Sequence, residues 1–577
     1  MNPARLTPHP KKLEDGNNMT TASDSAKYFT GWLLAFFLTV IGAHFWVVWL
    51  YGSALPFWDQ WDEALRLFKP WVEAHLSWAD IAAPFNGHRI IPTYLLDMSL
   101  IWLNGRWDPI LQMTVNAFIH ATFASGLAFS LWHFAGRGNG WLVCGLLLPF
   151  FTFPYAGENA LWGFNSMWYF PYVFGLVAIA GLGFCRAGSW PWWIGLAAAL
   201  LGLFTQALGL VAPTAIGGLL VLRAIRNRKF GREDLISLGA CWLLVGIGAA
   251  FNVRGNVDSP LQAHSFAEFA NALIRQLDWP FYTRPEMACV IVLPLALLLV
   301  YYLRPGFQAL RLAEWLLTLA LWSVLGSALV ATGRANYGEI IPSSRYTEIF
   351  SVLLIASLFA TILLGGQWQQ NRFLRWTGRW LPLVFAGVIY WGIAQMSNLV
   401  VDNLLVPTRA MNLIAEERVA AFMASGDDSV LLKRPTIRPD PKVALEVLRH
   451  PKLQAILPAA CVPATSAPEV GRLATASRWL LRQAVIIVVM GLVLFVGLSG
   501  FGLVRATKGL AVPKPEGILA LLAGLTALGF VWSKHSLQRD SIEYGLQQQL
   551  AESFKSAGAL DRAAFHAHKA DELKPVK

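Results

Sequence analysis

Long apolar segments are the feature that most constrains how this 577-residue chain can fold. A helix needs about 20 mostly apolar residues to cross the hydrocarbon core of a bilayer. Only 14% of the residues are charged, against about 25% in soluble proteins, so the sequence excludes a soluble enzyme and a disordered chain. It predicts an all-α polytopic membrane bundle with about thirteen spans: Phe29–Tyr51, Ile110–Phe134, Trp141–Phe153, Asn165–Cys185, Pro191–Thr205, Leu208–Leu222, Leu235–Phe251, Met287–Leu303, Leu312–Ala331, Thr347–Leu364, Trp380–Ser397, Trp479–Val504 and Gly517–Trp532.

The positive charges predict the orientation of this bundle. With thirteen spans, every basic loop falls on the side of the N-terminal segment 1–28. Basic loops stay in the cytoplasm, so we expect a cytoplasmic N-terminus. The net charge of +11 then reflects topology, and no nucleic-acid partner is expected. The same agreement favours two helices within Pro191–Leu222, broken near Gln206–Gly209, because a single helix would move the later basic loops outside.

The opposite side receives the longer polar segments. A first outer loop covers 52–109 and includes Ile90–Leu103, an apolar stretch that is too short to span easily and is interrupted by Asp97. Residues 398–478 have an ordinary polar composition and predict a small external domain. The expected divisions are the cytoplasmic segment 1–28, a transmembrane domain at 29–397, the external domain at 398–478, a C-terminal transmembrane hairpin at 479–532 and an amphipathic helical tail at 533–577.

Three carboxylates follow the first span, at Asp59, Asp62 and Glu63. If Trp58 opens a helix, Asp59 and Asp62 are three residues apart on one face. Such a pair can hold a metal ion, or one member can act as a base because its neighbour raises its proton affinity. The alternative is a helix N-terminus, with Asp59 as its cap and the other two as first-turn acids. Chemistry alone favours that alternative.

Two further motifs lie on the predicted outer face. His88 and Arg89 can contact an anionic group such as a phosphate, or they can be interfacial residues without a ligand. Glu158 and Asn159 precede Trp162, and a ring beside polar side chains can cradle a sugar. A belt of aromatic residues at the membrane surface is the commoner arrangement.

Two arginines also lie on the predicted outer face. Arg345 and Tyr346 lead into an apolar span on the side where positive charge is unusual, so Arg345 is predicted to bind a diphosphate or carboxylate. For Arg334 a structural role without a ligand is favoured over ligand binding. Ionisable residues inside the spans are few, so the relay pattern of a proton pump is not expected.

The long first loop, with acidic residues directly after the first span, resembles the GT-C superfamily of integral-membrane glycosyltransferases. The strings WDQWD from residue 58, GHR from 87, ENALWGF from 158 and SRY from 344 look like those of uncharacterised bacterial membrane proteins grouped with these enzymes. The resemblance covers the architecture of Phe29–Ser397. The residues that would name the sugar or the acceptor are not recognisable.

The resemblance implies an enzyme of the bacterial inner membrane that moves a sugar from a polyprenyl-phosphate donor to a glycan or lipid acceptor of the cell envelope. It implies Asp59 or Asp62 as the catalytic base and leaves a divalent metal ion open. The residues expected to bind substrate are Glu63, His88, Arg89, Glu158, Asn159, Trp162, Arg334, Arg345 and Tyr346. The alternatives are an O-antigen-type polymerase or ligase and a transporter or flippase of lipid-linked sugars. Carboxylates in one outer cavity favour transfer, whereas charges along a mid-membrane path favour transport.

Overall fold

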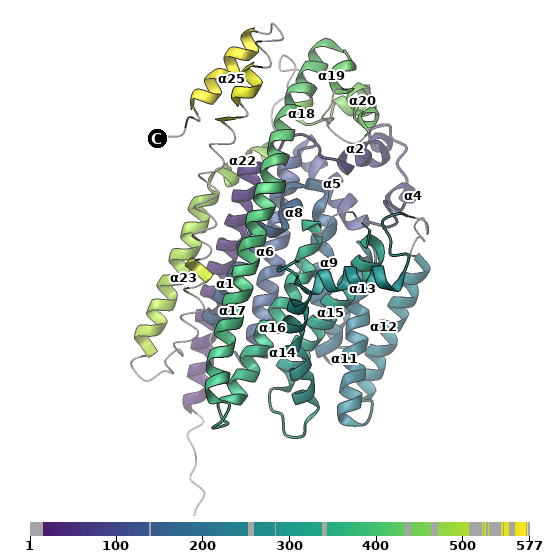
Figure 1. The fold of residues 1–577 in the computed structure, drawn as a ribbon. Helices are drawn as coiled ribbons and strands as arrows, with labels where there is room; N and C mark the ends of the chain where they lie inside the picture. Colours follow the sequence, from purple (N-terminus) through teal and green to yellow (C-terminus); the bar gives the residue numbers. More distant parts are fainter. Residues whose placement is uncertain are drawn as a thin grey trace, which may run out of the picture.

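A computed structural model describes residues 16–137, 140–251, 259–282, 284–336, 343–432, 440–462 and 471–506, with short stretches between 522 and 574. The structure is 82% helical, and the described residues contain no strand, only an isolated bridge between Phe85 and His88. The predicted all-α class is therefore confirmed. Figure 1 shows long helices running side by side, with short helices gathered at one end.

Within the described residues, ten helical segments are long and apolar enough to cross a membrane. A helix suits this environment because its backbone groups bond to one another and need no water. The segments contain α1 (Gly16–Tyr51), α6 (Pro109–Phe134), α7 (Gly140–Thr152) continued by η2 (Pro154–Ala156) and α8 (Gly157–Leu161), η3 (Gly163–Asn165) with α9 (Ser166–Phe184), η4 (Ala207–Leu210) with α11 (Val211–Asn227), α12 (Arg232–Phe251), α14 (Glu286–Leu303), α15 (Leu310–Arg334), η5 (Ser344–Tyr346) with α16 (Thr347–Trp368), and α17 (Arg375–Val400).

The expected count of thirteen spans is not confirmed. The pair α22 (Arg472–Arg482) and α23 (Ala484–Ala506) bends by 57° and would give an eleventh span if it crosses as one. Pro191–Thr205 forms α10 (Trp190–Gly202), whose 13 residues are fewer than a bilayer needs. Most of Gly517–Trp532 lies outside the described residues.

The division of Pro191–Leu222 into two helices is confirmed. α10 ends at Gly202, and η4 precedes α11. A Cβ on Gly209 would lie 1.8 Å from the carbonyl oxygen of Gly202, so the chain can pass this closely only with glycine at 209. The break brings Gln206 and its neighbours to the wall of the cavity described below.

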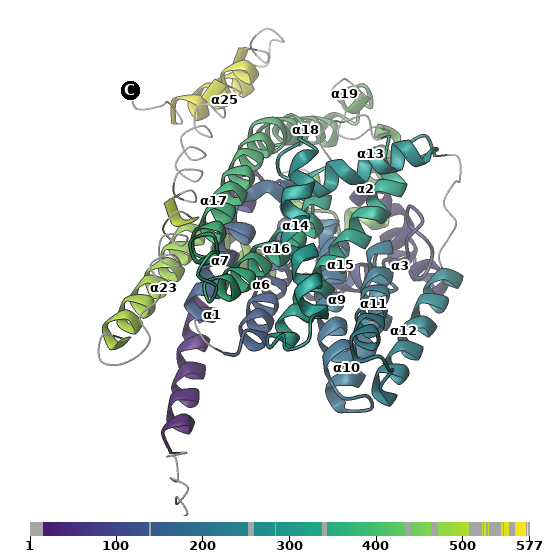
Figure 2. The same cartoon turned by 60° about the horizontal axis from the view of Figure 1, so that its bottom comes forward.

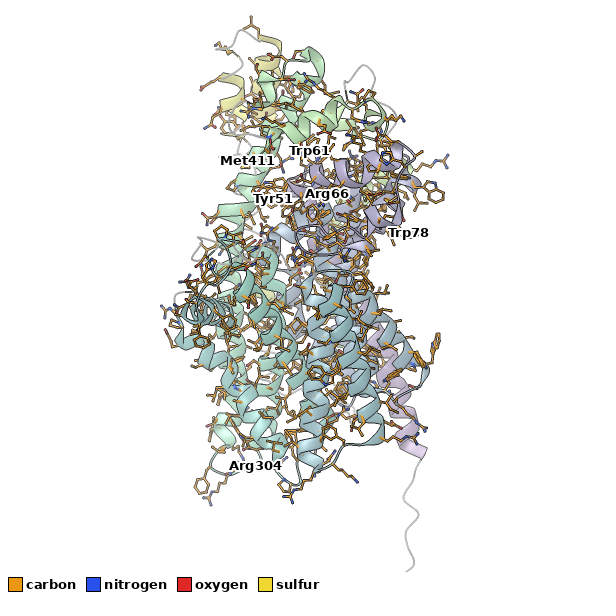
Figure 3. The ribbon with its side chains drawn as sticks, turned by 90° about the vertical axis from the view of Figure 1, so that its right-hand side faces the viewer. Tyr51, Trp61, Arg66, Trp78, Arg304 and Met411 are labelled. Atoms are coloured by element: carbon orange, nitrogen blue, oxygen red, sulfur yellow. The ribbon has the colours of Figure 1, made fainter. Side chains whose placement is uncertain are left out.

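The chain alternates between the two ends of the bundle. Arg304 lies at the end where α1 begins, together with the connection from α11 to α12 (Figures 1 and 3). Trp61, Arg66 and Trp78 of the first loop lie at the opposite end (Figure 3). Figure 2 shows α1 and α23 side by side at one edge, and α13 (Phe266–Leu277) on the outside of the bundle.

Two segments far apart in the sequence form a cap at the end opposite to Arg304. We define the cap as residues 52–108 together with 401–462, of which 433–439 are outside the described part. Its elements are α2 (Asp59–Glu63), η1 (Ala64–Phe68), α3 (Lys69–Val72), α4 (Trp78–Ile81), α5 (Ile91–Asn104), η6 (Val401–Leu405), α18 (Val406–Ser425), α19 (Ser429–Leu432), α20 (Pro441–Arg449), α21 (Pro451–Gln454) and η7 (Ala459–Cys461).

The two segments of the cap are bonded to each other. The hydroxyl of Ser53 donates to Glu416 over 2.8 Å, and the backbone N–H of Trp107 donates to the carbonyl of Ile456 over 2.8 Å. The segment predicted to form a small external domain therefore packs on the first loop. α25 (Leu560–Glu572), in the predicted tail, lies at the same end (Figure 1).

Candidate active site

A cavity of about 340 Å³ lies between the cap and the bundle. Its walls come from the first loop, α9, η4, α15 and the start of α16. Ligand pockets in proteins usually have volumes of about 300–1,000 Å³, so a sugar or a phosphate ester fits a space of this size. The polar side chains among its lining residues are Asp59, Asn86, His88, Gln206, Gln262, Thr332, Arg334, Arg345 and Tyr346.

Five of the predicted site residues line this cavity: Asp59, His88, Arg334, Arg345 and Tyr346. They come from three separate parts of the chain and meet because the cap lies on the ends of α15 and α16. The other six predicted residues do not line it; these are Asp62, Glu63, Arg89, Glu158, Asn159 and Trp162.

Asp59 and Asp62 both belong to α2, but only Asp59 reaches the cavity. The helix begins at Asp59, directly after Trp58, whose φ of 46° is in the left-handed region. Trp58 is the N-cap residue, so Asp59 does not have the capping position that the alternative interpretation gave it. The spacing of the two aspartates predicted one shared face, but only Asp59 lines the cavity. Asp59 is therefore the stronger candidate for a catalytic carboxylate.

Glu63 is buried inside the cap and does not reach the cavity. Glu63 and Asp97 of α5 are both 0% exposed. Burial raises the pKa of Glu63 well above its ordinary value, and the nearby charge of Asp97 raises it further. Burial also raises the pKa of Asp97 to about 7. Glu63, which was predicted to bind substrate, belongs to this buried pair, and a carboxyl group buried beside another keeps its proton.

We expect the buried pair of Glu63 and Asp97 to make the stability of the protein pH-dependent. The pKa of Asp97 is about 7 in the folded state and 3.8 ordinarily. Between pH 3.8 and about 7 the folded state therefore keeps a proton on Asp97 that the unfolded state releases. Stability should therefore fall as pH rises from about 4 to about 7. Asp97→Asn should flatten this dependence and raise the melting temperature at pH 8, as measured by tryptophan fluorescence in detergent. Asp62→Asn is the control, and equal pH dependence in both variants would contradict the assignment.

Helix α8 holds the backbone of Arg345. The N–H of Arg345 donates to Oε2 of Glu158 over 3.1 Å, and its carbonyl accepts from Nδ2 of Asn159 over 3.1 Å. The guanidinium group lies 5.9 Å from the ring centroid of Trp162 and 5.3 Å from that of Tyr346. Such cation–π contacts contribute about 0.5–2 kcal/mol each. The two sequence motifs, at 158–164 and 344–346, thus meet, and one positions the other.

Glu158 and Trp162 were predicted to contact a sugar. In the structure, each of these side chains forms hydrogen bonds with other protein groups. Oε2 of Glu158 accepts hydrogen bonds from the hydroxyls of Ser343 and, over 3.1 Å, Ser344. The indole of Trp162 is 4% exposed and donates to the carbonyl of Phe57 over 2.8 Å. Both side chains therefore stabilise the wall of the cavity from behind.

Trp162 connects the two charged walls of the cavity. Besides lying under Arg345, it holds Phe57, whose own N–H donates to Oε1 of Gln60 over 3.0 Å. These bonds fix the turn that leads into α2 and so fix Asp59. One buried ring thus positions the carboxylate and the guanidinium together.

His88 enters the cavity on a tight turn. The backbone groups of Phe85 and His88 bond to each other over 2.7 and 2.8 Å, and Asn86 and Gly87 have φ values of 47° and 84°. This is the geometry of a type I′ turn, for which Asn-Gly is a preferred pair. Burial lowers the pKa of His88, and the charge of Arg334 lowers it further. His88 is therefore neutral at pH 7, with one nitrogen to donate and one to accept a hydrogen bond.

Arg89 lies outside the cavity, although it was expected to bind a phosphate with His88. Its guanidinium donates to the carbonyls of Ala82 and, over 3.4 Å, Phe251. Arg89 therefore ties the first loop to the end of α12. Arg334, in contrast, stays at the cavity, where its Nε donates to the hydroxyl of Tyr346 over 3.4 Å.

The charged groups of the cavity favour an anionic ligand. Two guanidinium groups, of Arg334 and Arg345, line the same cavity as one carboxylate, Asp59, while His88 is neutral. Positive charge at a partly desolvated site attracts phosphate, and guanidinium groups can bind it with two hydrogen bonds. Within the part of the chain that the structure describes, no group of three or more His, Cys, Asp or Glu residues could hold a metal ion.

Neither models of known protein families nor curated proteins match this chain. Gln206 was not among the predicted site residues, although the helix break that carries it was predicted. A polar residue at a break between two apolar helices is the signal that could have identified it.

Proposed function

We propose that the protein is a GT-C-like glycosyltransferase that moves a sugar from a polyprenyl-phosphate donor to a glycan or lipid acceptor of the bacterial cell envelope. The observation that carries this proposal is the meeting of Asp59, Arg334 and Arg345 in one cavity at the end of a membrane bundle. A carboxylate and two guanidinium groups that line one cavity can supply a base and a phosphate site within one space.

An apolar groove next to the cavity supports a lipid-linked donor. The groove has a volume of about 570 Å³ and is lined by residues of α5, α9 and the end of α10. Ile91 and Phe204 line the groove, while Ile90 and Gln206 line the cavity. Two residues of chain span at most about 7 Å, so the two spaces are neighbours. A donor can place its phosphate in the cavity and its hydrocarbon chain in the groove.

The proposed reaction is a displacement at the anomeric carbon of the donor. Asp59 takes the proton of the acceptor hydroxyl as the acceptor oxygen bonds to that carbon. The bond from the carbon to the phosphate oxygen breaks, and the electron pair leaves with the polyprenyl phosphate. Arg345 and Arg334 stabilise the negative charge that grows on the phosphate. His88 is placed to hydrogen-bond a hydroxyl of the sugar.

The orientation of the bundle fits a lipid-borne donor. Basic loops such as the one that carries Arg304 lie at the end opposite to the cap, and such loops stay in the cytoplasm. The cavity then faces the outside of the bacterial inner membrane, and the N-terminus is cytoplasmic. No nucleotide sugars are available on that side.

Sugar transfer by the purified protein in proteoliposomes tests the proposal. The assay supplies radiolabelled polyprenyl-phosphate sugars and an extract of envelope glycans and lipids. We expect label in the acceptor fraction and release of unlabelled polyprenyl phosphate in equal amount. Movement of the intact labelled donor between the two leaflets without transfer would contradict the proposal and favour a flippase. If transfer occurs only from donors that carry an oligosaccharide, the result would favour the polymerase or ligase alternative.

A further inference from the structure

Three ionisable side chains from three helices meet inside the bundle, behind the wall that carries Arg345. They are His44 of α1, His120 of α6 and Glu348 of α16, and they are 7%, 7% and 5% exposed. The Nδ1 atoms of His44 and His120 are 3.4 Å apart, and Nε2 of His120 is 3.4 Å from Oε1 of Glu348. The three groups therefore form a continuous row, although 304 positions of sequence separate its ends.

The row continues to the cavity wall through one amide. Nδ2 of Asn159 donates to Oε2 of Glu348 over 3.2 Å and to the carbonyl of Arg345 over 3.1 Å. The oxygen of the same amide accepts from Asn165 over 3.3 Å, which fixes the orientation of the Asn159 side chain. A change of charge at Glu348 is therefore only one hydrogen-bonded residue away from Arg345.

A small cavity of about 30 Å³ adjoins this row. Its polar lining includes His44, His120, Tyr169 and Glu348. That volume is enough for one water molecule, which needs at least about 10–15 Å³. Nε2 of His44 is buried and has no hydrogen-bond partner among the described protein groups. A buried water in the small cavity would supply the missing partner.

We propose that His44, His120 and Glu348 form a proton-binding site, completed by one water molecule, whose occupancy is coupled through Asn159 to Arg345. Ionisable groups inside a bilayer are costly, and paired groups of this kind usually carry a function. Carboxylate and imidazole groups in hydrogen-bonded contact can hold one shared proton in place of two separate charges. No bond between heavy atoms changes, and water supplies the proton.

Other titratable groups surround the site. Tyr155 of η2, and Tyr169 and Tyr172 of α9, lie close enough to Glu348 to sense its charge. Towards the large cavity lie Glu158 and Arg345, and Asp59 and Arg334 line that cavity as well. Tyrosines ordinarily lose their protons near pH 10, so the histidines and Glu348 are the groups of the site that can exchange a proton below that pH.

The coupling has a definite sign. Binding a proton makes the site more positive, and this raises the electrostatic potential at Arg345 across a region of low dielectric. An anion in the large cavity should therefore bind more tightly as pH falls. This part of the inference rests on the proposed role of Arg345 in binding an anion.

Infrared spectroscopy tests the proton site without any ligand. Purified full-length protein is titrated with acid, and the carbonyl stretch of protonated carboxyl groups is recorded. A band that is present in the wild type and absent from the titration of Glu348→Gln supports the site. Identical difference spectra would overturn it. If Glu348→Gln does not fold, His120→Gln should shift the pH at which the same band appears, and an unshifted band would overturn the site.

Binding of sulfate tests the coupling, because the charge of sulfate is constant over the titration. Trp162 lies under Arg345, so tryptophan fluorescence reports binding. All variants carry His88→Gln, which removes the titration of the cavity histidine. In that background we expect sulfate affinity to rise at least about fivefold as pH falls, and Glu348→Gln to abolish this rise.

The matched control is Glu314→Gln, a buried glutamate that bonds to Arg223 and Tyr302 elsewhere in the bundle. It should keep the pH dependence of sulfate binding. The same pH dependence in Glu348→Gln as in the control would overturn the coupling. Absence of sulfate binding at every pH would contradict the proposed role of Arg345, whereas the infrared titration reports on the proton site separately.

Discussion

Asp59→Asn is expected to abolish sugar transfer while the protein stays folded and inserted. Loss of a general base typically lowers the rate by about 10²–10⁴-fold. Asn keeps the size of the side chain and removes its charge and basicity. Because Trp58, and not Asp59, is the N-cap residue of α2, the substitution should cost little stability. Transfer rate in proteoliposomes and melting temperature are the two measurements.

Asp62→Asn is the matched control for this prediction. Asp62 lies three residues further along α2, carries the same charge and does not line the cavity. It should keep a transfer rate within a few fold of the wild type. Equal activity of both variants would remove the carboxylates from the mechanism and favour transport. Loss of transfer with Asp62→Asn alone would assign the base to Asp62 and contradict the placement of the site.

Arg345→Gln is expected to lower the rate of transfer by about 10²–10³-fold, the usual effect of removing one group that stabilises negative charge in the transition state. The backbone of Arg345 is held by Glu158 and Asn159, so the truncated side chain should leave the wall in place. Arg345→Lys should recover only part of the rate, because an ammonium group cannot reproduce the planar, bidentate contact of a guanidinium. Steady-state kinetics with the lipid donor give kcat and KM separately.

Arg89→Gln is the control for the loss of a positive charge at the same end of the molecule. Arg89 bonds to the carbonyls of Ala82 and Phe251 outside the cavity. Its loss should lower the melting temperature and leave kcat nearly unchanged. A larger effect on kcat from Arg89→Gln than from Arg345→Gln would place the phosphate at Arg89 and contradict the assignment.

Composition and local pattern were enough to predict the helical membrane bundle and the break between α10 and α11. They also predicted Asp59 and Arg345 as site residues, since charges next to the predicted outer ends of spans are unusual. Both residues line one cavity. The number of spans was harder to predict from the sequence, because α10 is apolar but too short to cross a bilayer as an ordinary span.

The sequence could not separate residues that line the cavity from residues that position it. Glu158 and Trp162 have the chemistry of a sugar site, but tertiary contacts with Ser344 and Phe57 turn them into the support of Arg345. Glu63 has the chemistry of a metal or substrate ligand, and only the tertiary structure, which buries it near Asp97 of α5, shows that it does not reach the cavity. Local spacing carries no information on contacts between residues so far apart in the chain.

A structure of the protein with a bound short-chain polyprenyl phosphate tests the central claim most directly. We predict the phosphate oxygens at about 3 Å from the guanidinium nitrogens of Arg345, the hydrocarbon chain in the groove between α5 and α9, and Asp59 facing the open side of the phosphate. A phosphate bound at the end of the bundle that carries Arg304, or a hydrocarbon chain that enters the cavity in place of the phosphate, would contradict the account.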